Sequence, residues 1–162
     1  MLVYANENNG EYPTADKWCD LLIQYADVRP KQFICPKSGA KIGESSFAMN
    51  KNIIGKKASE IPPDVVLLFE TNFGKDSAGR RELLGNRGWY KFLDDAGVDW
   101  IREYSSAKKV YKQRWNQVGG PELVTCENHD GLGFNVLFND MSVRFIRSSG
   151  IGQLKWEVEE EK

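Results

Sequence analysis

The sequence predicts an α+β domain in which short helices pack on a small, mainly antiparallel sheet. Three features support this prediction: an amphipathic stripe near residue 20, a short apolar run near residue 67, and two β-rich runs around an Asn-Asp pair near residue 140. Along the chain the pattern reads helix, short strands, helix and hairpin. This order is typical of α+β domains.

The size and charge of the chain suit a single globular domain that spans residues 1–162. Of its 162 residues, 41% are hydrophobic and 28% are charged, which is close to the globular average. Lysine and arginine total 22 and aspartate and glutamate total 23, so the net charge of −1 gives no field to attract nucleic acid. The longest apolar run, residues 65–69, is too short to span a membrane.

The first nine residues have the pattern of the last turns of a helix. Leu2, Val3 and Tyr4 are suited to packing, and the Asn-Asn-Gly sequence that ends at Gly10 is a typical helix stop. We therefore expect the chain to begin inside a longer helix whose apolar upstream part is missing from the sequence.

A second helix is expected between Thr14, a candidate N-cap, and Pro30. Its apolar stripe has the i, i+3, i+4, i+7 spacing of an amphipathic helix and consists of Trp18, Leu21, Leu22 and Tyr25. Residues 32–36 then predict a short strand stopped by proline, and residues 46–50 predict another extended piece.

Residues 64–70 predict the central strand of the sheet, because apolar and β-branched residues occupy both of its faces. We expect a long polar loop over residues 71–86 and mostly helical structure over residues 89–115. A large part of this region, residues 74–114, is interpreted as an insertion into the domain.

The end of the chain predicts a β-hairpin. Residues 119–121 are expected to form a sharp Gly-Gly-Pro turn, and residues 128–133 a polar loop. Residues 134–138 and 141–147 are the two predicted strands, and the Asn-Asp pair at 139–140 is the turn between them.

Candidate chemistry centres on His129, the single histidine of the sequence. It could form a dyad with Cys126, but the neighbouring acidic residues disfavour a thiolate there. Cys126 and His129 could also bind zinc with Cys19 and Cys35, although strong zinc signatures consist of two closely spaced pairs. Alternatively, Cys19 and Cys35 could form a disulfide. We favour a histidine that is hydrogen-bonded within its loop, with no catalytic residue and no metal.

Calcium is the other cofactor that the sequence suggests. The oxygens that could hold it belong to Glu127, Asn128, Asp130, Asn139 and Asp140. Their spacing lacks the alternation of an EF-hand loop, so we expect no bound cofactor. The lysines and aromatic residues between 104 and 115 are interpreted as an amphipathic helix, not as a surface for nucleic acid.

The hairpin resembles the C-terminal signature of the prepilin-like H-X9-DG proteins, which are similar to the major pseudopilins of type II secretion. In that family a histidine precedes an Asn-Val-Leu-Phe strand, an Asp-Gly turn and a second strand. Here His129, residues 135–138, Asp140 and residues 143–146 occupy the corresponding places.

The front of the chain agrees with this resemblance. Residues 4–13 are similar to the point where the long helix of the family enters the head. Further similar segments are 33–36, 64–70 and 115–123. Two departures occur in the motif: ten residues separate His129 from Asp140, one more than the family has, and Met141 stands where glycine is usual. We therefore expect a longer, bulged hairpin turn.

The resemblance implies a structural, non-catalytic subunit of a type II secretion or type IV pilus-like assembly. Its partners would be other pilin-like subunits or proteins of the secretion apparatus. The missing helix would anchor the precursor in the inner membrane, with the head in the periplasm or at the cell surface. His129, Asn135 and Asp140 would be motif residues that shape the hairpin.

The resemblance also implies a rigid junction between helix and head, for which we expect Tyr4, Tyr12 and Trp18 to pack against the sheet. A function of another class is also open: a soluble ligand- or glycan-binding module. It would use exposed aromatic residues of the insertion, namely Trp89, Tyr90 and Trp100.

Overall fold

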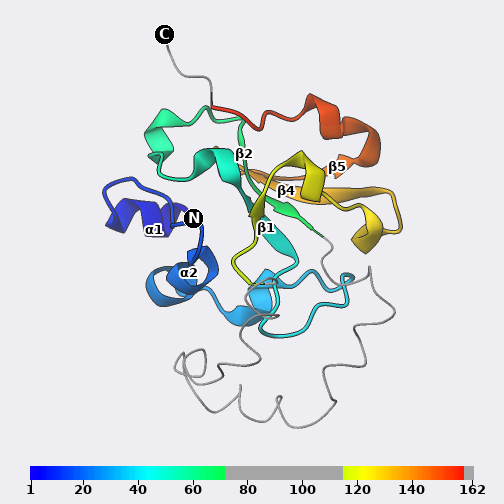
Figure 1. The fold of residues 1–162 in the computed structure, drawn as a ribbon, viewed down its shortest axis with the longest axis horizontal. Coiled ribbons are helices and arrows are strands. Elements are labelled where there is room, and N and C mark those ends of the chain that lie inside the picture. Colours follow the sequence, from blue (N-terminus) through cyan, green and yellow to red (C-terminus); the bar gives the residue numbers. More distant parts are fainter. Residues whose placement is uncertain (72–114, 159–162) are drawn as a thin grey trace.

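The computed structural model describes residues 1–71 and 115–158. The predicted insertion, and most of the loop and helical elements expected between residues 71 and 115, lie outside the described residues. The described part has an α+β architecture, in which two α-helices and several short 3-10 turns pack around one five-stranded sheet (Figure 1).

The sheet has the strand order β3-β1-β2-β4-β5. The strands are β1 (Phe47–Asn50), β2 (Val66–Glu70), β3 (Val118–Gly119), β4 (Gly133–Phe138) and β5 (Val143–Arg147). The pairs β1/β2, β2/β4 and β4/β5 are antiparallel, whereas β3 runs parallel to β1. The sheet is therefore mixed, with antiparallel pairs in the majority.

Strand β2 is the central strand, as its apolar sequence predicts. It lies between β1 and β4, and its residues Val66, Leu67 and Phe69 are completely buried. The side chain of Glu70, which ends the strand, is buried as well. Carboxylates are almost never buried without a partner, so this residue marks a place where polar groups must meet.

Two α-helices precede the sheet and lie side by side (Figure 1). α1 (Leu2–Glu7) ends as predicted: Gly10 has a φ of 81°, and its N–H donates to the carbonyl of Ala5. α2 (Trp18–Ala26) ends at a residue in the left-handed conformation, before the proline that was expected to stop it. None of the described helices is long and apolar enough to cross a membrane.

The predicted start of the second helix at Thr14 is wrong. Residues 14–17 form a turn in which the carbonyl of Thr14 accepts a hydrogen bond from the N–H of Lys17, so the helix begins only at Trp18. The side chain of the N-cap residue Lys17 makes no capping bond, and the Oδ1 of Asn116 accepts a hydrogen bond from the first-turn N–H of Cys19 at 2.7 Å. The apolar stripe was therefore a better guide to the helix than the capping pattern was.

The strand predicted at residues 32–36 does not form. Pro30 begins a 3-10 turn that ends at Phe33, because proline fixes φ near the helical value and has no N–H for a sheet. The segment is tied to Ser46, just before β1, by a backbone hydrogen bond of 2.8 Å from the N–H of Ser46 to the carbonyl of Phe33 and by one from the N–H of Cys35 to Oγ of Ser46. The Gly-Gly-Pro turn also differs from the prediction, since its first glycine belongs to β3.

Short 3-10 turns make up most of the described connections. They are η1 (Pro30–Phe33), η2 (Lys51–Ile53), η3 (Ala58–Glu60), η5 (Pro121–Leu123), η6 (Glu127–His129) and η7 (Ser148–Gln153). One of them, η6, replaces part of the loop that was expected before the hairpin.

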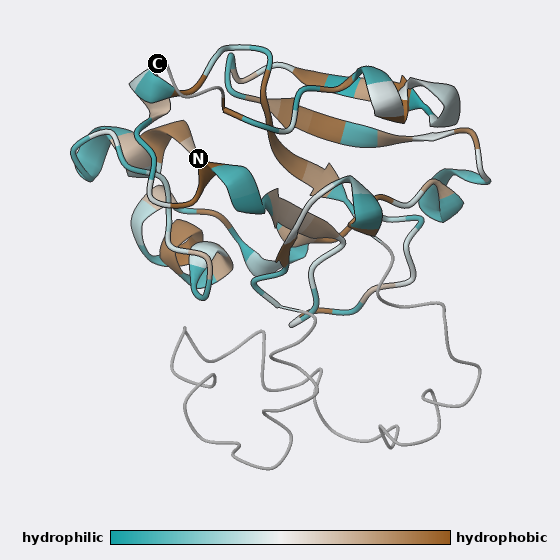
Figure 2. Cartoon of the chain, turned by 45° about the horizontal axis from the view of Figure 1, so that its top comes forward, coloured by the Kyte–Doolittle hydropathy of each residue, from teal (hydrophilic) through white to brown (hydrophobic). Residues whose placement is uncertain are grey.

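Two clusters of buried apolar residues pack on the sheet, one on each face. Figure 2 shows that the strands consist mostly of hydrophobic residues. On the face toward the helices, Met49 and Leu67 pack with Tyr4, Tyr12 and Trp18. The predicted packing of these three aromatic residues against the sheet is thus confirmed. The core on the opposite face consists of Ala48, Val66, Phe69, Phe134, Val136, Phe138 and Trp156.

The predicted hairpin is confirmed by the pairing of β4 with β5. At its turn, the N–H of Met141 donates to the carbonyl of Phe138, and the N–H of Phe138 donates to the carbonyl of Ser142. Met141 has a φ of 63°. This is the three-residue loop that ends in a left-handed bulge residue, so the expected bulged turn is present. β5 is an outer strand, and Val143 and Phe145 are exposed on it.

Candidate functional site

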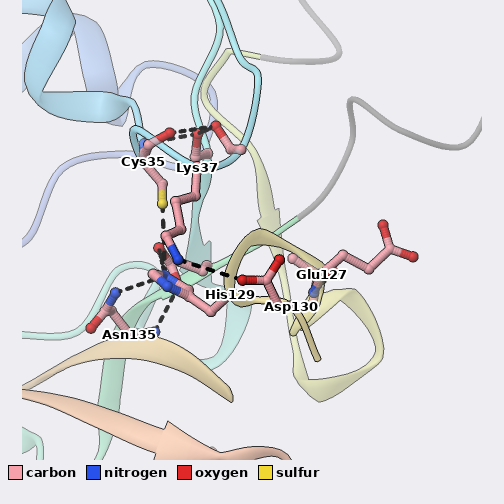
Figure 3. Close-up of polar contacts among 10 residues, drawn as sticks. Cys35, Lys37, Glu127, His129, Asp130 and Asn135 are labelled. Atoms are coloured by element: carbon pink, nitrogen blue, oxygen red, sulfur yellow. Dashed lines mark hydrogen bonds and ion pairs between the residues drawn. The ribbon is translucent and has the colours of Figure 1, made fainter. Parts of the chain in front are cut away.

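Four side chains from separate parts of the chain meet at one end of the sheet (Figure 3). Glu70 ends β2, and Asn135 lies beside it in β4. His129 is the last residue of η6, which leads into β4, and Cys35 follows η1. The pairing of β2 with β4 brings the end of one strand to the turn that precedes the other. We call these four residues the His129 cluster.

The Nε2 atom of His129 is the common contact of this cluster. It lies 3.1 Å from Oε1 and 3.0 Å from Oε2 of Glu70. The Sγ of Cys35 is 3.7 Å away, and the Nδ2 of Asn135 is 3.2 Å away. An imidazole nitrogen either donates or accepts one hydrogen bond, according to its tautomer, so these neighbours compete for a single atom.

The carboxylate of Glu70 is the buried charge of the cluster. Its side chain is 1% exposed, whereas that of His129 is 20% exposed. The backbone N–H of Asn135 donates to Oε2 of Glu70 at 2.8 Å. A buried carboxylate is costly unless it is paired and hydrogen-bonded. His129 and this N–H supply those interactions and hold η6 against β2.

Cys35 is held by a tight turn. Its N–H donates to Oγ of Ser46 at 3.0 Å, and its carbonyl accepts a hydrogen bond of 2.8 Å from the hydroxyl of Ser38. Burial raises the pKa of the Cys35 thiol, a backbone hydrogen bond from Lys37 opposes that rise, and the carboxylate of Glu70 adds to it. Without a further ligand, Cys35 is therefore a neutral thiol near neutral pH.

The turn that carries His129 is closed by local contacts. The N–H of His129 donates to the carbonyl of Cys126 at 3.1 Å, and Asp130 follows in a left-handed conformation with a φ of 57°. The imidazole also meets the ring of Phe145 edge-on, with 5.3 Å between centroids. At the surface, Lys37 pairs with Asp130 at 3.5 Å and links this turn to that of Cys35 (Figure 3).

Two of the three predicted motif residues meet in the cluster, namely His129 and Asn135. Asp140 lies beyond the far end of β4, where its carboxylate accepts a hydrogen bond of 2.8 Å from the N–H of Ser142 and pairs with Arg144 at 3.1 Å. Hydrogen bonds from Ser142, assisted by the charge of Arg144, lower the pKa of the Asp140 carboxyl. Asp140 therefore stabilises the turn and takes no part in the cluster.

The three cysteines do not assemble in the way that the sequence suggested. All three are free thiols, so the structure has no Cys19–Cys35 disulfide. Cys19 is buried in the core, where burial raises the pKa of its thiol. Burial and the nearby Glu70 also raise the pKa of Cys126, which disfavours a thiolate in a dyad with His129. Cys35 is the cysteine that reaches His129.

The oxygens considered for calcium are not gathered either. Residues 127–130 precede β4 and residues 139–140 follow it, so a strand of six residues, about 20 Å long, separates the two groups. The amide of Asn139 makes hydrogen bonds to Tyr12, Ala58 and Ile61. The predicted ligand contacts Trp89, Tyr90 and Trp100 lie outside the described residues.

Sequence reasoning missed Glu70 as a member of the site. The available signal was its position, because it ends the most apolar strand of the chain, where a carboxylate needs a buried partner. The role of Asn139 was missed as well, since its partners lie in segments far away along the chain.

Comparison with known proteins gave no match to this chain among protein-family models, curated proteins or solved structures.

Proposed function

We propose that this chain is the globular head of a pilin-like subunit, which works by assembly into a type II secretion or type IV pilus-like structure and has no catalytic activity. The observation that carries the proposal is the packing of α1. Its residues Tyr4 and Ala5 are buried in the head, whereas Leu2 and Val3 are exposed beside Asn6 and Glu7. A helix that is anchored on one side and has exposed apolar residues on the other can pack against neighbouring subunits.

The hairpin turn also supports the proposal. Met141 has a φ of 63°, a conformation that glycine adopts more readily than other residues. It occupies the position at which the resembled family has the glycine of its Asp-Gly motif. The backbone therefore has the shape that would favour this glycine, although the residue itself differs.

In this proposal the His129 cluster has a structural role. His129 and Asn135 surround the carboxylate of Glu70 and fix the hairpin to the central strand. The partners would be other pilin-like subunits or secretion-apparatus proteins, in the periplasm or at the cell surface. An apolar helix continuous with α1 would anchor the precursor in the inner membrane.

The reading frame upstream of Met1 tests this proposal. We expect it to encode about 20 apolar residues in helical phase with α1, since that length spans a bilayer, and a short basic leader before them. An in-frame stop codon directly upstream would contradict the proposal. That result would favour a soluble binding module that uses Trp89, Tyr90 and Trp100.

Assembly can be tested in cells that express the full-length gene. Val3 is 55% exposed on α1, so Val3→Glu should remove the protein from sheared filaments and from cross-linked subunit pairs without unfolding the head. Leu132, which is 69% exposed in the loop before β4, provides the matched control Leu132→Glu, and this variant should assemble normally. Unchanged assembly of the Val3→Glu variant would contradict a role for this face of α1.

A further inference from the structure

The His129 cluster brings three kinds of metal-binding atom to one point. The Sγ of Cys35, the Nε2 of His129 and a carboxylate oxygen of Glu70 all lie within 4.8 Å of one another. In residues 1–71 and 115–158, this is the group of His, Cys, Asp and Glu side chains that could hold a metal ion. Two of its members are buried, unlike the acidic groups that commonly gather on protein surfaces.

The spacing of these atoms is close to that of a tetrahedral zinc site. With Zn–N and Zn–O of about 2.0–2.1 Å and Zn–S of about 2.3 Å, tetrahedral angles place N and S about 3.5 Å apart and N and O about 3.3 Å apart. The corresponding distances here are 3.7 Å from His129 to Cys35, and 3.0 and 3.1 Å from His129 to Glu70. The third pair, the Cys35 sulfur and a Glu70 carboxylate oxygen, lies within 4.8 Å. Side-chain rotations that bring this pair to about 3.5 Å would complete the zinc geometry.

Charge balance also favours a divalent cation at this point. The Cys35 thiolate and the Glu70 carboxylate would together carry two negative charges, and a neutral imidazole from His129 would add none. A divalent cation would make this buried group electrically neutral, and Cys35 and Glu70 would bind the ion in place of competing for one nitrogen. Hydrogen bonds alone cannot satisfy all of these contacts at His129.

The surroundings of the ligands are arranged as an outer shell. The N–H of Cys35 donates to Oγ of Ser46 at 3.0 Å, and its carbonyl accepts a hydrogen bond of 2.8 Å from the hydroxyl of Ser38, so the residue is fixed in its turn. The backbone N–H of Asn135 holds one oxygen of Glu70 at 2.8 Å, which leaves the other oxygen available. Hydrogen bonds from neighbouring groups to metal ligands orient those ligands and raise the affinity of the site for its metal.

We propose that Cys35, Glu70 and His129 bind one zinc ion, with a water molecule as the fourth ligand. A thiolate and an imidazole suit zinc, whereas calcium and magnesium prefer oxygen ligands alone. The ion would join the Cys35 turn, the end of β2 and the start of the hairpin. This inference goes beyond the proposed function and does not depend on it.

Metal titration of the purified chain tests the proposal. After removal of metal with a chelator under reducing conditions, zinc should bind with one equivalent per chain and raise the midpoint of thermal unfolding. Cobalt(II), used as a spectroscopic probe, should give the near-ultraviolet charge-transfer band of a thiolate ligand and the intense visible bands of tetrahedral coordination. Failure to bind zinc stoichiometrically would overturn the proposal.

Single substitutions identify the ligands. Cys35→Ser and His129→Ala should weaken zinc binding by more than about 100-fold, beyond the 10–100-fold effect typical of outer-shell partners. Cys35→Ser replaces one atom and preserves the shape of the site, so it remains informative if His129→Ala does not fold. Cys126→Ser is the matched control and should keep both the zinc affinity and the cobalt band.

The opposite pattern would contradict the proposal. If the cobalt band survived Cys35→Ser and disappeared in Cys126→Ser, Cys35 would not be a ligand. The titration requires no assembly of subunits, so its failure would leave the proposed pilin-like function untouched. In the same way, a negative result in the assembly test would not alter the zinc measurement.

Discussion

The hydroxyl of Tyr12 donates a hydrogen bond to Oδ1 of Asn139, which joins the segment after α1 to the turn of the C-terminal hairpin. The amide nitrogen of Asn139 donates in addition to the carbonyls of Ala58 and Ile61, at 3.1 and 2.6 Å. One side chain of the hairpin turn thus holds three distant segments together. The segment after α1 is thus fixed to the rest of the domain by these polar contacts as well as by apolar packing.

Asn139→Ala should be strongly destabilising, because it leaves two carbonyls and the hydroxyl of Tyr12 without this partner. We expect the free energy of unfolding to fall by about 2–3 kcal/mol, measured by urea denaturation. Asp140→Ala at the next position is the control. Its ion pair with Arg144 lies at the surface, so that change should destabilise the protein much less than Asn139→Ala does. Equal effects of the two substitutions would contradict the bridging role of Asn139.

Tyr12 should make the stability of the folded domain depend on pH in alkaline solution. Burial raises the pKa of Tyr12 to about 12, from the ordinary value of 10.0. The folded state therefore disfavours the phenolate, and the stabilisation from this residue is complete below pH 10 and is lost as the pH rises toward 12. Tyr12→Phe should remove this part of the pH dependence. Denaturation curves across that range, with absorbance titration of the phenolate, provide the measurement.

Substitution of His129 should destabilise the fold, because the buried carboxylate of Glu70 would lose a partner. In metal-free protein, we expect His129→Ala to lower the free energy of unfolding by about 2–3 kcal/mol, since Glu70 loses its imidazole partner and keeps only the N–H of Asn135 among the partners described above. The double variant with Glu70→Gln should be less destabilised than the sum of the two single changes. Additive effects would contradict the coupling. Loss of a specific hydrolytic activity in His129→Ala would contradict the non-catalytic role of the cluster.

Met141 offers a direct test of strain in the hairpin turn. Met141→Gly and Met141→Ala lose nearly the same packing, but only glycine tolerates the φ of 63° without strain. We expect the glycine variant to be more stable than the alanine variant by about 1 kcal/mol. This order is the reverse of that at an ordinary position, where alanine is the more stable residue. Thermal unfolding of the two variants side by side gives the difference.

Gly133 should not tolerate any side chain. A Cβ atom there would lie 2.1 Å from the carbonyl oxygen of Ile146, a backbone atom of the neighbouring strand that cannot easily move. Gly133→Ala should therefore lower the midpoint of thermal unfolding and disturb the pairing of β4 with β5. Gly152→Ala is the control, because an added Cβ meets no atom within 4 Å there. A normal midpoint for Gly133→Ala would show that the strands can separate at this point.

Much of the sheet could be predicted because its strands carry their own signals. The apolar run that ends at Glu70 and the two β-rich runs around the Asn139 turn depend on local composition, and all of them formed strands. Residues 32–36 also contain apolar residues that favour a strand, but Pro30 begins a 3-10 turn that extends to Phe33. β3 consists of Val118 and Gly119 alone, and its parallel pairing with β1 depends on tertiary structure.

The candidate site was predicted only in part, for a related reason. His129 and Asn135 are six positions apart and belong to one recognisable segment. Their partnership with Glu70 depends on the register of β4 against β2, and the approach of Cys35 depends on a turn that the sequence pattern assigned to a strand. Such long-range placement has no signature in local periodicity.

The strand order has a consequence for synthesis on the ribosome. β2 is complete when Glu70 has been made, but its neighbour β4 begins only at Gly133. At about 5–20 residues per second, the roughly 60 residues between them take several seconds to translate. During that interval the side of the most apolar strand that pairs with β4 lacks its partner, so we expect the nascent chain to need protection from aggregation until β4 has been made.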